Sequence, residues 1–233
     1  MSGKIYPTVT SVSWHPGNTA PRHLRRKLTW EEALYAQTFP PTYKWPPQKT
    51  KKWKLLGNAF PPKMARVIAD MIPLKGGTFI DLFCGVGGWI EGFKHKFECV
   101  LAVDVDPLAA RYCKLNHPEV PVVCADILHF HRWPKADIVV GSPPCQQFSV
   151  LRFLHWDNYK GKKVDLSLIK RFYEVVAEVK PKFWFMENVR GVRKWIKDAQ
   201  VVNMADFGVP QKRVRAIHSN MIIKARFKHA FNM

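Results

Sequence analysis

Long apolar runs and acidic side chains are scarce in this sequence. No stretch of about 18 apolar residues is present, the length that a membrane-spanning helix needs, and the opening residues have no apolar core of the signal-peptide kind. Only 18 Asp and Glu stand against 37 Lys and Arg, so the net charge is +19. We therefore expect a cytoplasmic protein with no membrane partner. The charge favours nucleic acid as the partner, although a solvated basic surface is the alternative.

The cysteines are few and irregularly spaced. There are five, and no two have the C-x-x-C spacing of a zinc site: Cys84, Cys99, Cys113, Cys124 and Cys145. An odd number argues against a disulfide framework and favours reduced thiols, one of which could be a nucleophile. His129 and His131 form an isolated H-x-H pair, which is more typical of ordinary loop histidines than of metal ligands. We therefore expect no metal.

The first 56 residues differ in composition from the rest. They are rich in basic residues, tryptophan and proline, and four prolines predict that long regular elements are absent: Pro40, Pro41, Pro46 and Pro47. A short helix is expected near residues 29–37, with Thr29 as its N-cap and Glu31 and Glu32 in its first turn. We therefore divide the chain into an N-terminal segment, residues 1–56, and a larger domain, residues 57–233.

From residue 62 onward, helical and strand patterns alternate. Apolar residues at spacings of three and four predict a helix at 62–72, and further helices are expected at 89–95, 107–116 and 165–179. Short apolar runs predict strands at 78–83, 99–103, 120–124, 138–140 and 183–186. This alternation predicts an α/β fold with a mostly parallel sheet and helices on both faces. In such sheets the ligand site lies at the carboxyl ends of the strands.

Three of the expected strands are followed by residues suited to binding a nucleoside. A glycine-rich stretch at 84–88, the glycine loop, follows the first strand and could bring the backbone close to a ligand at a helix N-terminus. A simple tight turn is the alternative. Asp104, after the second strand, suits a ribose diol, and Asp126, after the third, could bind an adenine amino group. Together these residues favour a nucleoside cofactor without a pyrophosphate.

The two remaining strands are followed by a cysteine and a glutamate. The fourth strand runs into Pro143, Pro144 and Cys145, and Glu187 follows the fifth. Cys145 opens a loop, residues 146–163, in which basic and aromatic side chains are interleaved. A buried structural cysteine would more often lie within an apolar strand. A thiol at a strand end beside a cationic loop is typical of a nucleophile that acts next to a nucleic acid.

Six sequence motifs, taken together, resemble those of the DNA cytosine-C5 methyltransferases. They are F-I-D-L-F-C-G-V-G-G at 79–88, G-S-P-P-C-Q-Q-F-S at 141–149, E-N-V at 187–189, Q-K-R-V-R at 211–215, G-N-A-F-P-P at 57–62, and L-T-x-x-E followed by Q-T-F-P within 28–40. They cover most of the chain. The resemblance implies a Rossmann-like methyltransferase fold, with S-adenosylmethionine as the cofactor and S-adenosylhomocysteine as its product.

The resemblance also implies roles for single residues. Cys145 would add to C6 of cytosine and make C5 nucleophilic. Glu187 would hold and protonate N3, while Arg215, with Arg213, would stabilise O2 and depress the pKa of the thiol. The target base would be flipped out of double-stranded DNA, with basic residues binding phosphates. The residues implied for the cofactor are Asp81, Phe83, Gly85, Val86, Gly87, Gly88, Asp104, Val105, Asp126, Ile127, Pro144, Leu168, Asn58 and Phe60.

The order of the motifs departs from that of most family members. The L-T-x-x-E and G-N elements usually close the chain, whereas here they precede the glycine loop, which indicates a circular permutation typical of restriction–modification enzymes. We expect no separate target-recognition domain in this chain, so a split enzyme with a separate recognition subunit is one alternative. An RNA (tRNA) cytosine-C5 methyltransferase is another. A pure binding module and an NAD-dependent dehydrogenase are disfavoured by Cys145 and Glu187. The expected location is the nucleoid of a prokaryotic or viral system.

Overall fold

The computed structural model describes residues 5–10, 27–146, 148 and 164–225. Most of the basic, aromatic loop expected at 146–163 lies outside these residues. The helices within them are α1 (Trp30–Gln37), α2 (Lys49–Asn58), α3 (Pro62–Met71), α4 (Gly88–Phe93), α5 (Pro107–Asn116) and α8 (Ser167–Val179), with short 3-10 turns η1 (Arg190–Lys194) and η2 (Met204–Phe207). None of the helices described is long and apolar enough to cross a membrane.

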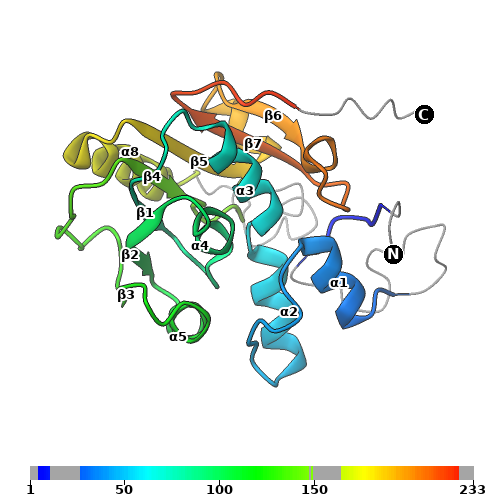
Figure 1. Ribbon diagram of the computed structural model, residues 1–233. Helices are drawn as coiled ribbons and strands as arrows, with labels where there is room; N and C mark the ends of the chain where they lie inside the picture. Colours follow the sequence, from blue (N-terminus) through cyan, green and yellow to red (C-terminus); the bar gives the residue numbers. More distant parts are fainter. Residues whose placement is uncertain (1–4, 11–26, 147, 149–163, 226–233) are drawn as a thin grey trace.

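A seven-stranded sheet runs through the centre of the molecule (Figure 1). Its order is β3 (Val122–Cys124), β2 (Glu98–Asp104), β1 (Thr78–Leu82), β4 (Ile138–Gly141), β5 (Phe183–Val189), β7 (Val214–Ser219) and β6 (Gln200–Asn203). Strands β1 to β5 pair in parallel, whereas β7 runs antiparallel to both of its neighbours, β5 and β6. The strand order reverses between β1 and β4, which is where ligands bind in open α/β sheets. The expected α/β, Rossmann-like architecture is confirmed.

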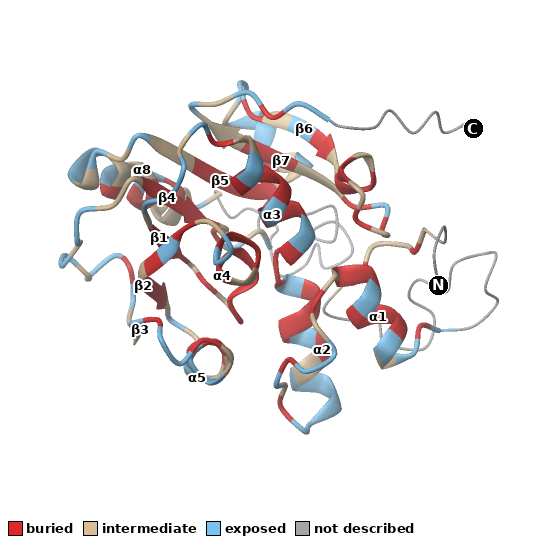
Figure 2. Cartoon of the chain, viewed as in Figure 1, coloured by how far each residue is buried: buried red, intermediate tan, exposed pale blue. Residues whose placement is uncertain are grey.

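Helices cover both faces of the sheet, because strand residues alternate between two apolar cores. On one face, α3 and α4 bury Ile68 and Phe93 against Phe79 of β1. On the other face, α8 buries Phe172 and Val175 against Ile80 and other strand residues. Figure 2 shows the central strands mostly buried, as expected for a sheet enclosed on both faces. This packing fixes the carboxyl ends of β1, β2, β4 and β5 relative to one another.

The helix expected near 29–37 forms as α1, and its N-terminus is a capping box. Thr29 Oγ1 accepts a hydrogen bond from the Glu32 N–H, and Glu32 Oε2 accepts one from the Thr29 N–H. These two side chains satisfy backbone donors that the first helical turn leaves without partners. The other expected helices and the strands at β1 to β5 also form, with ends shifted by a few residues.

The expectation of no long regular element in the N-terminal segment was wrong. Helix α2 begins at Lys49, two residues after the last of the four prolines, and buries Trp53, Leu55 and Leu56. Proline restricts the residues around it but does not prevent a helix from starting downstream. Figure 1 shows α1 and α2 side by side next to the sheet. The boundary expected between residues 56 and 57 falls within α2, and the division of the chain there stays a prediction.

The elements at the far edge of the sheet were not predicted either. Strands β6 and β7 follow η1, and β7 lies against β5 in an antiparallel register that pairs Glu187 with Ile217 and Val189 with Arg215. Strand β5 therefore runs to Val189, and Glu187 lies within the strand rather than after it.

Buried polar side chains fasten the N-terminal segment to the turn before β7. Gln211, which is fully buried, accepts a hydrogen bond from the Val9 N–H through Oε1 at 2.7 Å. Its Nε2 donates to Ala36 O and to Gln37 Oε1. Gln37 donates in turn to Leu56 O. The backbone of Tyr6 adds a parallel bridge to Gln211. The Q-T-F-P motif, through Gln37, and the Q-K-R-V-R motif, through Gln211, therefore share one hydrogen-bond network although they lie far apart in the sequence.

Replacing Gln211 by alanine should destabilise the protein by about 2–4 kcal/mol, because buried Val9 N–H and Gln37 Oε1 lose their partner. Denaturant unfolding measures this free energy. Gln48→Ala is the matched control, since Gln48 is exposed and makes no side-chain capping bond, and it should change stability by less than about 0.5 kcal/mol. Equal effects of the two substitutions would show that the network does not hold the segment.

Candidate functional site

A cavity of about 260 Å³ opens where β1, β2, β4 and β5 end, and we call it the site cavity. It is lined by residues from every motif group except L-T-x-x-E. The expected site residues that line it are Asn58, Phe60, Phe83, Gly85, Gly88, Asp104, Val105, Pro144, Cys145, Glu187, Arg213 and Arg215. The volume lies just below the usual range for small-molecule sites, about 300–1,000 Å³. The structure therefore brings the implied cofactor loop and the implied catalytic residues into one space.

Cys145 is held at the end of β4 by hydrogen bonds to the residues just before it. The buried Asn188 side chain donates to Pro143 O at 3.0 Å, and Trp89 Nε1 donates to Ser142 Oγ at 3.1 Å. The first bond links the Pro-Pro-Cys turn to β5, and the second links it to α4 behind the glycine loop. Both contacts fix the position of the thiol relative to Glu187.

Glu187 and Arg215 face one another from neighbouring strands. Arg215 Nε lies 3.0 Å from Glu187 Oε1, and the two side chains are 14% and 11% exposed. An ion pair that is this shielded from solvent has a defined geometry, in contrast to surface pairs. The pair presents a carboxylate and a guanidinium side by side to the site cavity.

Arg213 lines the same cavity but directs its terminal nitrogens elsewhere. Nη1 donates to Val9 O at 2.8 Å and Nη2 donates to Gly57 O at 3.1 Å. Burial, followed by the nearby charge of Arg215, lowers the pKa of Arg213 to about 9. Because two backbone carbonyls use these donors, Arg213 ties the N-terminal segment and α2 to β7.

The pKa of the Cys145 thiol is raised above its ordinary value. Burial is the largest cause and the negative charge of Glu187 adds to it, while Arg215 and Arg213 act in the opposite direction. The arginines do depress this pKa, as expected, but desolvation outweighs them. The thiol is therefore neutral near pH 7 in the protein without substrate.

The part of the site cavity formed by the glycine loop, residues 57–60 and Asp104 is called the cofactor half. It contains one residue with a strained backbone, Phe83, and one carboxylate held by backbone hydrogen bonds, Asp104. Phe83 has φ +61° and Gly85 has φ +56°, a region that non-glycine residues rarely occupy and that marks functional turns. The Gly85 N–H donates to Asp104 Oδ2 at 2.7 Å and the Asp106 N–H donates to Asp104 Oδ1 at 2.8 Å. Burial raises the pKa of Asp104.

These features fit a nucleoside cofactor. Each Asp104 oxygen accepts one backbone hydrogen bond and keeps a further lone pair for a ribose hydroxyl. Val105 is 64% exposed beside it and offers an apolar surface for a base. A side chain added at Gly85 would meet nothing within 4 Å, so the loop backbone is open toward the cavity there.

Gly88 lets two motifs approach closely. A Cβ at Gly88 would lie 2.0 Å from Phe60 O, so only glycine allows the N-terminus of α4 to pack on the G-N-A-F element. The Phe60 ring stacks on Trp89 with centroids 3.9 Å apart. This contact places residues 57–60 over the cofactor half of the cavity.

Several residues implied for the cofactor lie outside the site cavity. Val86 and Gly87 form the back of the glycine loop. Asp126 is exposed and its Oδ1 caps Leu128 N, Ile127 is buried, and Leu168 packs on the α8 side of the sheet. Asp81 is fully buried, and neither of its carboxylate oxygens has a hydrogen-bond partner among the described residues. Burial, followed by the charge of Asp104, raises the pKa of Asp81.

Other residues that line the cavity were missed. Lys54 and Leu55 come from α2, the helix that was not expected, and Asp106 is the N-cap of α5. The sequence signal for Asp106 was available, because aspartate before proline is a common helix start. Lys54 Nζ lies 3.8 Å from Asp106 Oδ2.

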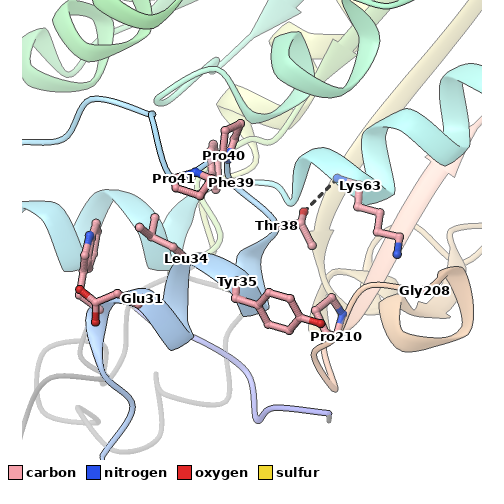
Figure 3. Close-up of a pocket in the computed structure, with 11 residues that line it drawn as sticks. Glu31, Leu34, Tyr35, Thr38, Phe39, Pro40, Pro41, Lys63, Gly208 and Pro210 are labelled. Atoms are coloured by element: carbon pink, nitrogen blue, oxygen red, sulfur yellow. Dashed lines mark hydrogen bonds between the residues drawn. The ribbon is translucent and has the colours of Figure 1, made fainter. Parts of the chain in front are cut away.

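A second and larger cavity, about 700 Å³, shares no lining residue with the site cavity. It is bounded by α1, the turn after it, Lys63 of α3 and Pro210 (Figure 3). Its lining is mostly apolar, and Thr38 Oγ1 accepts a hydrogen bond from the Lys63 N–H at its edge. None of the residues implied for catalysis or for the cofactor contributes to it.

Comparison with known proteins gives the family. The sequence-family model named C-5 cytosine-specific DNA methylase matches residues 2–73 and 77–198 of the chain. The chain belongs to this family. Membership implies S-adenosylmethionine as the cofactor, as the motifs had predicted. The circularly permuted order of those motifs stays a prediction.

Curated relatives are named as Type II methyltransferases. The chain is 34% identical over 169 residues to M.XorII of Xanthomonas oryzae pv. oryzae, covering 59% of this chain and 39% of that protein. It is 32% identical over 174 residues to M.AquIA of Picosynechococcus sp., covering 58% and 68%. Among solved structures it is similar to a prophage-encoded E. coli protein described as a DNA modification methyltransferase, with 26% identity, TM-score 0.49, and coverage of 61% and 45%. The chain thus spans about two fifths of the length of M.XorII.

Glu187→Gln should make Cys145 more reactive toward iodoacetamide at neutral pH, by about three- to tenfold. The substitution removes the negative charge that raises the thiol pKa and leaves Arg215 unpaired beside it. The alkylation rate of the Cys145 peptide, followed by mass spectrometry across pH, measures this shift. Glu174→Gln, on the exposed side of α8, should leave the rate unchanged. An unchanged or slower rate in Glu187→Gln would refute the electrostatic coupling.

Proposed function

We propose that this protein transfers the methyl group of S-adenosylmethionine to C5 of cytosine in double-stranded DNA, with Cys145 as the nucleophile. The observation that carries the proposal is the site cavity, which holds Cys145, the Glu187–Arg215 pair and the glycine loop with Asp104. The Type II names of the relatives support a role in DNA modification. The residues that hold the cofactor are Asp104 at the ribose, Phe83 and Val105 at the adenine, and Gly85, Asn58, Phe60 and Pro144 around the remainder.

The bound cofactor supplies an activated methyl group, and the chain supplies the activation of cytosine. Carbon 5 of cytosine is a weak nucleophile until a thiolate adds to C6. Cys145 gives its proton to solvent and its sulfur forms the bond to C6, which moves negative charge onto N3 and O2. After transfer, the proton on C5 leaves to a base that the sequence does not identify, and the bond to Cys145 breaks.

The Glu187–Arg215 pair fits the edge of the cytosine ring that gains charge. N3 and O2 are adjacent on the ring, and the pair offers a carboxylate and a guanidinium 3.0 Å apart. N3 takes up a proton from solvent, which replaces the one that Cys145 released. Glu187 holds this proton at N3, and Arg215 donates to O2. These are charge-assisted contacts that strengthen as charge develops, so they stabilise the adduct more than the free base.

A base within a duplex does not reach this cavity, because Cys145 and Glu187 are largely shielded from solvent. The cytosine therefore has to be flipped out of the helix. The loop at 146–163 is the proposed agent, on the grounds of its basic and aromatic composition. The net charge of +19 supports salt-dependent phosphate contacts along the duplex.

Cys145→Ser should reduce methyl transfer at least about a thousandfold, since a neutral hydroxyl is a far weaker nucleophile than a thiolate. Affinity for S-adenosylhomocysteine should stay within about twofold, because the cofactor half of the cavity is unchanged. The assay is transfer of labelled methyl from S-adenosylmethionine to duplex DNA and to RNA, with the product bases identified. Cys124→Ser, at an exposed thiol, should keep full activity.

Equal loss of transfer and cofactor binding in Cys145→Ser would contradict the role given to Cys145. Transfer to RNA but not to DNA would favour a tRNA-type enzyme. No transfer by the wild-type chain, with cofactor binding intact, would show that a separate recognition subunit is needed.

A further inference from the structure

The glycine loop has a rear side that faces away from the site cavity. Val86 and Gly87 lie on it, and neither lines the cavity. Val86 is 1% exposed and packs in the apolar cluster of the N-terminal segment. Gly87 has φ +91° and Gly85 has φ +56°, and Phe83, just before the loop, has φ +61°. Phe83 is strained at this φ, and the two glycines are free to adopt other conformations, so the loop needs support from outside to keep one conformation.

Tyr43, from the N-terminal segment, provides one such contact. Its buried hydroxyl donates to Val86 O and lies 2.9 Å from Nε2 of His117. Because the hydroxyl has a single proton and gives it to Val86, the histidine donates from Nε2 to the tyrosine oxygen. His117 is 1% exposed, and burial lowers its pKa, so it is a neutral donor at pH 7.

The two side chains press directly against Gly87. A Cβ at Gly87 would lie 2.8 Å from His117 Cδ2 and 3.1 Å from the Tyr43 hydroxyl oxygen. The loop therefore has no room to move backward, away from the cavity. On the side that faces the site cavity, a Cβ at Gly85 would contact nothing within 4 Å. Tyr43 and His117 therefore support the glycine loop only from the side opposite the cavity.

Tyr43 and His117 are themselves anchored. The Asn116 side chain accepts a hydrogen bond from the Lys44 N–H at 2.7 Å and donates to Lys44 O at 3.0 Å, which joins the residue after Tyr43 to the end of α5. The Lys94–Glu91 ion pair lies nearby, with Glu91 3.8 Å from His117 Nε2, and Glu119 lies 3.8 Å from Nδ1. The other end of α5 begins at Asp106, which lines the site cavity.

We infer that Tyr43 and His117 are positioning residues that hold the glycine loop in its cofactor-binding conformation. They set cofactor affinity and leave the methyl-transfer step unaffected, because neither touches the site cavity. The inference rests on the proposed function for the identity of the cofactor. Without the Tyr43 hydroxyl, the Val86 carbonyl is buried without its side-chain donor and the loop populates other conformations. The apparent affinity for the cofactor then falls in proportion to the fraction of molecules whose glycine loop is in the binding conformation.

Calorimetric titration of the purified full chain with S-adenosylhomocysteine is the test. Tyr43→Phe should weaken binding by about three- to twelvefold, the ratio expected for one lost hydrogen bond. The turnover number at saturating cofactor should stay within about twofold, so the change falls on KM. Tyr112→Phe is the matched control, because Tyr112 packs partly buried on the same cluster and does not line the site cavity, and it should bind as the wild type does.

A second pair of variants separates positioning from general stability. His117→Gln keeps a donor at similar reach and should retain most of the affinity, whereas His117→Leu should lose as much as Tyr43→Phe. In the cofactor-free protein, amide hydrogen exchange at residues 84–88 should be faster in Tyr43→Phe than in the wild type. That readout does not depend on any bound group.

Wild-type affinity in Tyr43→Phe, or an equal loss of affinity and turnover number, would overturn the inference. So would an unchanged exchange rate at residues 84–88. A wild-type chain that binds no S-adenosylhomocysteine would instead overturn the proposed function, and the two failures are therefore distinguishable.

Discussion

The buried hydrogen bonds of Gln37, Gln211 and Arg213 are the interaction on which the rest of the site depends. These side chains are almost fully removed from water, so their polar groups need partners within the protein, and all but Arg213 Nε have one among the described residues. The partners lie in the N-terminal segment, in α1 and in α2. As a result, sequence elements separated by more than a hundred residues form one structure, and Lys54 and Asn58 are carried to the site cavity.

Burial also sets the chemistry of the cavity. It raises the pKa of Cys145 and Asp104 and lowers that of Arg213. A neutral thiol is a poor nucleophile and a poor target for oxidants. In the proposed reaction, the edge of the cytosine ring lies against Glu187 and Arg215, which are paired with each other in the structure. The protein without substrate therefore keeps its thiol unreactive, and substrate binding completes the electrostatic environment.

The sequence predicted the parts of the fold that depend on local patterns. Periodicity and caps identified α1, α3, α5 and α8, and the rule of carboxyl strand ends brought Cys145, Asp104 and the glycine loop together. Helix α2 was missed because prolines next to it masked an ordinary helix start at Lys49. Asp126 was placed in the site by the same rule of strand ends and Ile127 by the family resemblance, and neither lines the site cavity, although β3 ends beside Asp104.

Contacts between distant residues could not be predicted. Tyr43 and His117 are 74 positions apart, and no periodicity relates them. The raised pKa of Cys145 could not be predicted from the sequence either. It depends on how completely the thiol is desolvated, which the two prolines before it do not indicate. The sequence therefore identified the ionisable groups of the site, whereas the direction of each pKa shift depends on burial in the folded protein.

Trapping of a covalent complex tests the central claim most directly. Mixed-sequence duplex DNA made with 5-fluorocytosine blocks the last step, because fluorine on C5 does not leave as a proton does. Incubated with the protein and S-adenosylmethionine, it should give a protein–DNA adduct that survives denaturation and maps by peptide mass spectrometry to Cys145. An adduct at another residue, or efficient methyl transfer to normal DNA with no adduct on the fluorinated duplex, would contradict the account.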